Sequence, residues 1–219
     1  MEHEFWHQKW ESNDIGFHED DANPFLVKYF NRLELSESPR IFLPLCGKTT
    51  AIAWLLAQGC RVAGAELSPR AVGQLFEDLK LSPVVERAGE LTHYRAPHLD
   101  IYAGDLFQLD RKLLGAVDAV YDRAALVALP AGMRDRYASH LNYLVPAAPH
   151  LLISFEYDQS LMPGPPFAVA QTDIMACYEN THEIHLLERV DLNGGLKGSV
   201  AAQETIWLLE PKIRKISTM

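Results

Sequence analysis

The sequence has a shortage of positive charge and no long apolar run, and each shortage excludes a class of protein. Its 20 Lys and Arg residues are outnumbered by 29 Asp and Glu residues, which gives a formal net charge of −9 at pH 7. A negative field repels phosphate backbones and anionic lipids, so general binding to nucleic acid or to a membrane surface is not expected. No apolar run approaches the roughly 18 residues that a membrane-spanning helix needs.

Cysteine is also scarce. The three cysteines, Cys46, Cys60 and Cys177, include no close pair, so they cannot form a disulfide framework and instead fit a reducing compartment. The first residues lack the basic-then-apolar pattern of a signal peptide, and we therefore expect a cytoplasmic protein. With 48% hydrophobic residues among 219, the chain is predicted to fold as one domain. Nothing in its surface pattern demands a dimer, so we expect a monomer.

Several catalytic motifs are missing. Gly47-Lys48-Thr49 resembles the end of a phosphate-binding loop, but Phe42 occupies the position where that loop needs its first glycine. No G-x-S-x-G or C-x-x-C motif occurs, which argues against the corresponding hydrolases and thiol-redox enzymes. The nine histidines predict no metal site, because His182 and His185 fall on opposite faces of a predicted strand.

Strand-like and helix-like segments alternate along most of the chain. After a helical extension over residues 5–32, short apolar strands are predicted at 40–45, 61–67, 99–107, 117–122 and 150–157. A segment near 92–95 is expected to pair with the third of them. Helices are predicted at 49–58, after Ser68-Pro69, after Pro130 and at 169–179. This order is typical of a parallel sheet with helices on both faces.

The end of the chain differs from this pattern. Residues 183–192 and 200–209 are β-like and are joined through Asn193-Gly194-Gly195. An Asn-Gly step between two strand patterns is a strong hairpin signal. The sequence therefore predicts a doubly wound α/β sheet that closes with an antiparallel hairpin.

Four predicted strand ends carry residues that suit a ligand site. Gly47 follows the first strand, and Glu66 ends the second, 19 residues later, a spacing at which a carboxylate can bind a ribose diol. Asp105-Leu106-Phe107 ends the third strand and Asp122-Arg123 the fourth. The spacing also fits a tight turn with an exposed Glu66 and no ligand. It fits a dinucleotide-dependent oxidoreductase as well, although the G-x-G-x-x-G fingerprint is absent.

A set of motifs resembles a known family. The segments FWHQKW with IGFH, IFLPLCGK, VAGAELSP, YDRAALVALP and SFEYDQSLMPGPPF occur in this order. Together they resemble the thiopurine S-methyltransferase family, in particular its bacterial branch, over essentially the whole chain. The resemblance implies a class I S-adenosylmethionine-dependent methyltransferase fold: a doubly wound, mostly parallel seven-stranded sheet with an antiparallel last strand. It further implies one methyltransferase domain over residues 1–219, with residues 1–35 as an N-terminal lid.

The resemblance also implies which residues contact the S-adenosyl-L-methionine cofactor. Trp10 of the K-W motif is expected to close over it. Leu45 is expected to contribute a backbone contact, and Gly47 to line the methionine portion. Glu66 is expected to bind the ribose hydroxyls.

Two more positions follow from the family motifs. Leu106 is expected to pack near the adenine, and Arg123 to lie at the cofactor end of the active site, facing the acceptor. Asp105 departs from the eukaryotic relatives, which carry a small polar residue there, so the resemblance assigns it no role.

The activity implied is S-methylation of thiopurines and other aromatic or heterocyclic thiols, with selenium or tellurium compounds as further acceptors. The acceptor sulfur attacks the methyl carbon, and S-adenosyl-L-homocysteine departs. An acidic heteroaromatic thiol arrives largely ionised, so no general base is named, and Arg123 is expected to face its negative charge. A non-catalytic S-adenosylmethionine-binding module remains an alternative that turnover would distinguish.

Overall fold

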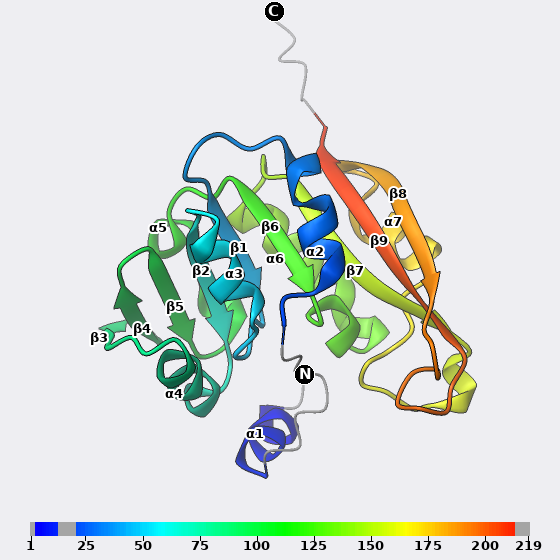
Figure 1. The fold of residues 1–219 in the computed structure, drawn as a ribbon, viewed down its shortest axis with the longest axis horizontal. Coiled ribbons are helices and arrows are strands. Elements are labelled where there is room, and N and C mark those ends of the chain that lie inside the picture. Colours follow the sequence, from blue (N-terminus) through cyan, green and yellow to red (C-terminus); the bar gives the residue numbers. More distant parts are fainter. Residues whose placement is uncertain (1–2, 13–20, 213–219) are drawn as a thin grey trace, which may run out of the picture.

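The apolar runs of the sequence form the strands of one sheet. A computed structural model describes residues 3–12 and 21–212, apart from the side chain of His3. The motif at residues 15–18 and part of the predicted extension over 5–32 lie outside the described residues. Within them, Figure 1 shows a twisted sheet with helices packed on both faces.

The sheet is mixed and contains nine strands in the order β3-β4-β5-β2-β1-β6-β7-β9-β8. Five strands are mutually parallel in the order β5-β2-β1-β6-β7, and β9 runs antiparallel to both β7 and β8. The strand bounds are β1 Arg40–Pro44, β2 Arg61–Glu66, β3 Val84–Ala88, β4 Leu91–Ala96, β5 Leu99–Ala103, β6 Ala119–Arg123, β7 His150–Tyr157, β8 His182–Asp191 and β9 Ala202–Pro211.

The expected seven strands are therefore too few for the described residues. The antiparallel β3–β4 hairpin extends the sheet beyond β5. The predicted pairing of residues near 92–95 with the third strand is correct, because β4 pairs with β5. β3 was not predicted because four of its five residues are exposed, so its sequence carries no alternation of apolar and polar residues.

The predicted closing hairpin is present. β8 and β9 pair antiparallel, and Asn193-Gly194-Gly195 lies in their connection. The connection spans residues 192–201 and contains an isolated bridge between Leu196 and Val200, so it is longer than a two-residue turn.

The helices predicted at 49–58, after Ser68-Pro69, after Pro130 and at 169–179 are present. The described part of the extension predicted over 5–32 contains two α-helices, and the short helix at 111–114 was not predicted. Ser68 caps α4, since its Oγ accepts a hydrogen bond from the Ala71 N–H at 3.3 Å, and Pro69 opens the helix. The α-helices are α1 His3–Glu11, α2 Pro24–Tyr29, α3 Ala51–Ala57, α4 Pro69–Asp78, α5 Arg111–Leu114, α6 Ala131–Leu144 and α7 Gln171–Tyr178. Short 3-10 turns are η1 Phe30–Leu33, η2 Leu106–Gln108, η3 Leu126–Ala128 and η4 Gln159–Leu161.

Two apolar layers hold these helices on the sheet. Successive residues of β1 alternate between the layers: Ile41 and Leu43 pack with α2, α3 and α4, whereas Phe42 packs with α6 and α7. This alternation is the period of two that a sheet covered on both faces requires. Among the described residues, no helix is long and apolar enough to cross a membrane.

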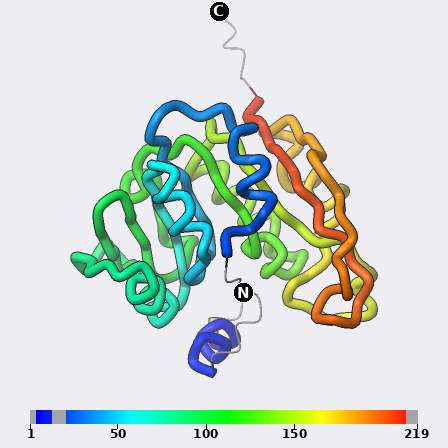
Figure 2. Tube along the Cα trace, viewed as in Figure 1, coloured from blue at the N-terminus to red at the C-terminus, as the bar shows by residue number. Residues whose placement is uncertain are grey.

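The N-terminal and C-terminal parts of the chain meet on one face. Figure 2 shows α2, in blue, beside the orange and red β8–β9 hairpin. Glu188 of β8 accepts hydrogen bonds from Lys28 Nζ and from the Tyr29 hydroxyl, both at 2.8 Å. The carboxyl ends of the five parallel strands lie together at one edge of the sheet.

Candidate functional site

The candidate site lies at the carboxyl edge of the parallel strands. The chain runs outward from β1 in both directions, with β2 on one side and β6 on the other, so a topological switch point lies between β1 and β6. Ligands of doubly wound sheets bind beyond the strand ends at this point. The predicted residues Leu45, Gly47, Glu66, Leu106 and Arg123 all follow or end strands at this edge.

Glu66 is buried and held by backbone groups. It is 5% exposed, and its Oε2 accepts a hydrogen bond from the Gly47 N–H and its Oε1 from the Ser68 N–H, each at 2.8 Å. Burial raises the pKa of this carboxyl to about 7, although the hydrogen bonds oppose the shift. The alternative of an exposed strand end is therefore wrong. A carboxylate has about four acceptor positions, so the two oxygens can accept further donors.

The turn after β1 needs glycine at position 47. Gly47 has φ +54°, and a Cβ there would lie 3.0 Å from Cζ2 of Trp10. Leu45 also has a positive φ, +46°, and the Cys46 N–H donates to Ala65 O at 2.9 Å. The backbone thus passes close beneath the Trp10 ring, which leaves no room for a side chain.

Trp10 joins the N-terminal helix to this turn. It belongs to α1, is 3% exposed, and its ring lies against Gly47. Sequence spacing alone did not determine whether this tryptophan packs in the core or borders the site. Its contact with Gly47 places it over the same turn that Glu66 holds.

The turn after β5 is capped by its own side chain. Oδ1 of Asp105 accepts a hydrogen bond from the Phe107 N–H at 3.0 Å, which makes Asp105 the N-cap of η2. Leu106 is buried, and its carbonyl oxygen lies 2.9 Å from Nε2 of His140. Asp105 therefore has a local structural role, which the sequence had left unassigned.

Asp122 and Arg123, the last two residues of β6, differ in burial. Asp122 is 1% exposed; its Oδ2 accepts from the Tyr137 hydroxyl at 2.7 Å and its Oδ1 from the Leu126 N–H at 3.2 Å. Burial raises the pKa of Asp122 to about 6. Arg123 is only partly buried, and Ala124 after it has φ +66°, a conformation that L-residues seldom adopt. The two neighbouring residues therefore have different surroundings.

The loop after β7 reaches the turn that follows Arg123. The Phe167 N–H donates to Val127 O at 2.7 Å, and the Tyr157 hydroxyl donates to Pro166 O at 2.6 Å. The M-P-G-P-P-F segment, known from the sequence only as a motif, is thereby anchored beside β6.

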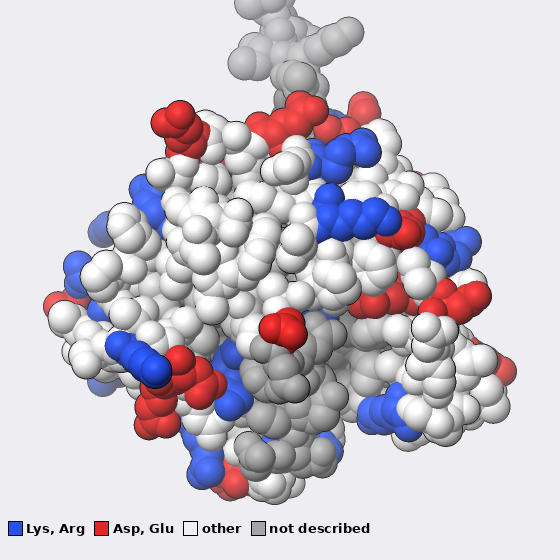
Figure 3. All heavy atoms as spheres, viewed as in Figure 1, with Lys and Arg blue, Asp and Glu red and all other residues white. Residues whose placement is uncertain are grey.

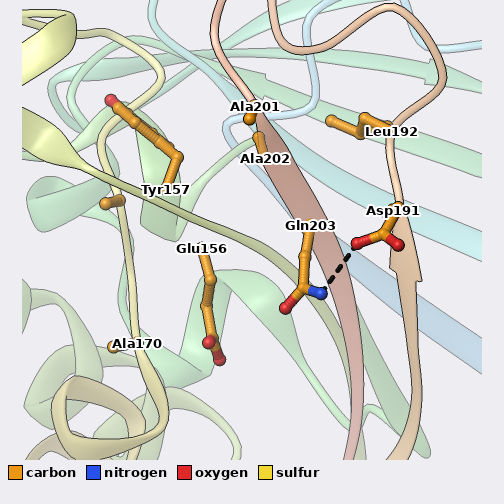
Figure 4. Close-up of a pocket in the computed structure, with 9 residues that line it drawn as sticks. Glu156, Tyr157, Ala170, Asp191, Leu192, Ala201, Ala202 and Gln203 are labelled. Carbon is orange, nitrogen blue, oxygen red and sulfur yellow. Dashed lines mark hydrogen bonds between the residues drawn. The ribbon is translucent and has the colours of Figure 1, made fainter.

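A cavity of ≈ 580 Å³ lies farther along the same edge, on the side of the closing hairpin. Figure 4 shows Glu156, Gln203 and Asp191 in a row across β7, β9 and β8, with Gln203 Nε2 donating to Asp191 Oδ1 at 2.8 Å. Arg189 Nη2 binds Glu156 Oε1 at 3.1 Å. None of the predicted site residues lines this cavity, so it is separate from the turn beneath Trp10.

Charged side chains of both signs are mixed on one face of the molecule (Figure 3). On the face drawn in Figure 3, Lys and Arg side chains are scattered among acidic and uncharged residues. Within residues 3–12 and 21–212, no group of three or more His, Cys, Asp or Glu side chains is placed to hold a metal ion.

Comparison with protein families and curated relatives identifies the family. A family model described as thiopurine S-methyltransferase matches residues 1–212. A thiopurine S-methyltransferase of Xanthobacter autotrophicus is 52% identical over 211 residues, covering 96% of this chain and 99% of that protein. Another of the same name, from Teredinibacter turnerae, is 45% identical over 213 residues and covers 97% and 99%.

A solved structure shares the fold. The chain is similar to the 1,6-didemethyltoxoflavin-N1-methyltransferase of Burkholderia thailandensis, crystallised with S-adenosylhomocysteine, with a TM-score of 0.63. The match covers 95% of this chain and 87% of that one at 14% identity, a level at which the likeness establishes the fold alone. The expected Rossmann-like methyltransferase fold is thereby confirmed.

Proposed function

Because the chain belongs to the thiopurine S-methyltransferase family, we propose that it methylates the sulfur of small thiols with S-adenosyl-L-methionine. The proposed acceptors are thiopurines and other aromatic or heterocyclic thiols, with selenium or tellurium compounds as a second class. The observation that carries the proposal is the buried Glu66 carboxylate, held against Gly47 beneath Trp10 at the switch point of the sheet.

The residues at this edge fit the cofactor. Glu66 has acceptor positions beyond those that the Gly47 and Ser68 N–H groups occupy, as a ribose diol requires. Gly47 lets the backbone pass close beneath the Trp10 ring, where a Cβ would crowd that ring. We propose that Trp10, Leu45, Gly47, Glu66, Leu106 and Arg123 hold S-adenosylmethionine.

The bound cofactor supplies a methyl group on a positively charged sulfonium. Arg123 is permanently protonated, and it would face a thiolate acceptor and hold it by charge. An ionised thiol needs no general base, so alignment and exclusion of water are the main requirements on the protein. Family membership disfavours the dinucleotide-dependent oxidoreductase considered from spacing.

The same proposal includes how the molecule is organised. Residues 1–219 act as one methyltransferase domain, and residues 1–35 cover the site as a lid, which the contact between Trp10 and Gly47 supports. We further propose that the protein works as a monomer in the cytoplasm, with no nucleic-acid or membrane partner. Equal proteolysis of the N-terminal segment with and without S-adenosylhomocysteine would argue against the lid.

Calorimetric titration with S-adenosylhomocysteine tests the cofactor, and turnover tests the enzyme. We expect one-to-one binding, followed by methyl transfer from S-adenosylmethionine to a thiopurine, to a simple aromatic thiol and, as a separate arm, to a selenium compound. Absence of binding would contradict the proposal at its centre. Binding without transfer to any acceptor would instead favour the non-catalytic binding module.

A further inference from the structure

A buried arginine outside the predicted site connects two loops that border it. Arg134 lies in the first turn of α6 and is 5% exposed. A buried guanidinium has lost its hydration and is stable only where hydrogen-bond acceptors replace the water. Its Nε donates to Leu129 O at 3.1 Å and its Nη2 to Ala168 O at 2.9 Å. Its Nη1 lies 3.4 Å from Oδ1 of Asp173.

These acceptors belong to different segments at the carboxyl edge. Leu129 ends the turn 124–129, which follows Arg123. Ala168 belongs to the loop 162–170, which follows β7 and η4 and leads into α7. One guanidinium therefore bridges the segment after β6 and the segment after β7.

Other hydrogen bonds hold the turn 124–129 and the loop 162–170 close to Arg134. One turn farther along α6, the Tyr137 hydroxyl binds Asp122 at 2.7 Å, just before Arg123. On the other segment, the Ala168 N–H donates to Gln159 Oε1 at 2.8 Å. Phe167 and Val127 join the two segments directly through their backbones at 2.7 Å.

We propose that Arg134 is a positioning residue for the methyl acceptor. By fixing the loop 162–170 against the turn 124–129, its guanidinium sets the separation between Arg123 and the opposite wall of the acceptor site. The inference rests on the proposed function. A displacement of about 1 Å in such a wall can lower a rate by roughly a hundredfold, because the reacting atoms lose their alignment.

The competing explanation is that Arg134 only stabilises the fold. Arg40 offers a matched comparison at the opposite, amino edge of the sheet. Its guanidinium also binds backbone carbonyls, those of Leu114 and Ala116, and an acidic side chain, that of Asp100. A loss of acceptor kcat/KM in the variants of both arginines would indicate an effect of stability. A loss confined to the Arg134 variants would indicate positioning.

The test compares Arg134→Met, Arg134→Lys and Arg40→Met in the full-length protein. For each variant, thermal unfolding, S-adenosylhomocysteine affinity, and KM and kcat for a thiopurine acceptor are measured well below the unfolding midpoint. We expect Arg134→Met to lower acceptor kcat/KM at least tenfold while its S-adenosylhomocysteine Kd stays within twofold of wild type. Arg134→Lys keeps the charge but not the planar fork, so it should recover only part of the loss. Arg40→Met should unfold at a lower temperature with kcat/KM within twofold of wild type.

Two results would overturn the inference. One is a folded Arg134→Met variant whose acceptor kcat/KM matches wild type. If that variant does not fold, an unchanged kcat/KM in Arg134→Lys would equally overturn the inference. The other is an equal loss of kcat/KM in the Arg134 and Arg40 variants. A wild-type protein that binds no S-adenosylhomocysteine would contradict the proposed function instead, before any variant is compared.

Discussion

At the scale of single residues, hydrogen-bond partners distinguish two buried carboxylates that the sequence presents as alike. Glu66 ends β2, and Asp122 is the residue before the end of β6. The Gly47 and Ser68 N–H groups hold Glu66, whereas Asp122 supports the turn after it through Tyr137 and Leu126. Only Glu66 contacts the turn beneath Trp10. The carboxylate assigned to the cofactor and the one assigned to structure are therefore distinguished by their partners.

Glu66→Gln should weaken S-adenosylhomocysteine binding by about 1–3 kcal/mol, because charged hydrogen bonds to the ribose are lost. The amide also presents a donor to one of the two backbone N–H groups that the carboxylate accepts. Calorimetry measures the change. Glu86→Gln, which alters an exposed carboxylate paired with Arg95, serves as the control and should bind like wild type.

The same carboxyl predicts a pH dependence of binding. Burial raises the pKa of Glu66 to about 7 from an ordinary value of 4.5, so the group gains a proton as the pH falls through about 7. A protonated carboxyl is the weaker acceptor, and affinity should therefore be lower at about pH 6 than at about pH 8. Glu66→Gln should flatten this dependence; an equally steep profile in the variant would assign it to another group.

Arg123→Ala should lower acceptor turnover in a folded protein, because a permanently charged partner for the thiolate is removed. The expected loss in kcat/KM is roughly tenfold to a thousandfold, as for other groups that stabilise charge during reaction. Steady-state kinetics across several thiols measures it, with Arg95→Ala, an exposed arginine of β4, as the control. Wild-type turnover in Arg123→Ala would assign this side chain to packing.

At the scale of elements, the turns after β1 and β6 use unusual backbone conformations to aim residues at the site. Leu45, Gly47 and Ala124 all have positive φ angles. Such conformations disfavour L-residues and persist where surrounding contacts hold them. At Gly47 those contacts are the Glu66 carboxylate and the Trp10 ring.

Gly47→Ala should destabilise the fold by about 1–2 kcal/mol from the left-handed backbone, with a further loss from moving Trp10. Gly73→Ala is the matched control, since Gly73 lies inside α4 with nothing within 4 Å of its added Cβ. That substitution should stabilise the protein by about 0.5–1 kcal/mol. Urea unfolding of both variants measures the contrast, and equal effects would argue against the close approach of Trp10.

At the scale of the whole molecule, a buried polar cluster lies at the amino edge of the sheet, opposite the site. His150 begins β7 and is 1% exposed; its ring centroid lies 4.7 Å from that of His182 and 5.7 Å from that of Tyr178. Burial, with a smaller effect of His182, holds the pKa of His150 well below 6.5. Burial also lowers the pKa of His182. Both rings are therefore neutral in the folded protein at pH 7.

This cluster should make the fold sensitive to acid. Below about pH 6.5 the unfolded chain binds a proton at His150 that the folded protein does not, so the unfolding free energy falls as the pH drops. Above pH 6.5 the histidine contributes no pH dependence. Between pH 6.5 and about pH 5 one such histidine accounts for up to about 2 kcal/mol.

His150→Phe isolates this contribution. Urea unfolding at about pH 5 and about pH 8 gives, for wild type and for the variant, the loss of unfolding free energy on going to the lower pH. This loss should be larger in the wild type. The raised pKa values of Glu66 and Asp122 affect both proteins alike and cancel in the comparison. Equal differences would contradict the assignment to His150.

Much of this protein can be predicted from local sequence. The apolar runs predict five parallel strands, Ser68-Pro69 predicts the start of α4, and the segments around Asn193-Gly194 predict the closing hairpin, because strand period, helix caps and turns act over a few residues. The family motifs predict the methyltransferase fold. The roles of Trp10, Leu45, Gly47, Glu66, Leu106 and Arg123 stay predictions until ligand binding is measured.

Tertiary structure decided what these patterns could not. It buried Glu66 against Gly47, turned Asp122 toward Tyr137, extended the sheet through β3, and placed Arg134 between two loops that are distant in sequence. Nothing in the sequence near Arg134 distinguishes it from a surface arginine of an amphipathic helix. Burial, pKa and hydrogen-bond partners depend on which segments pack together, and that is a property of the whole fold rather than of neighbouring residues.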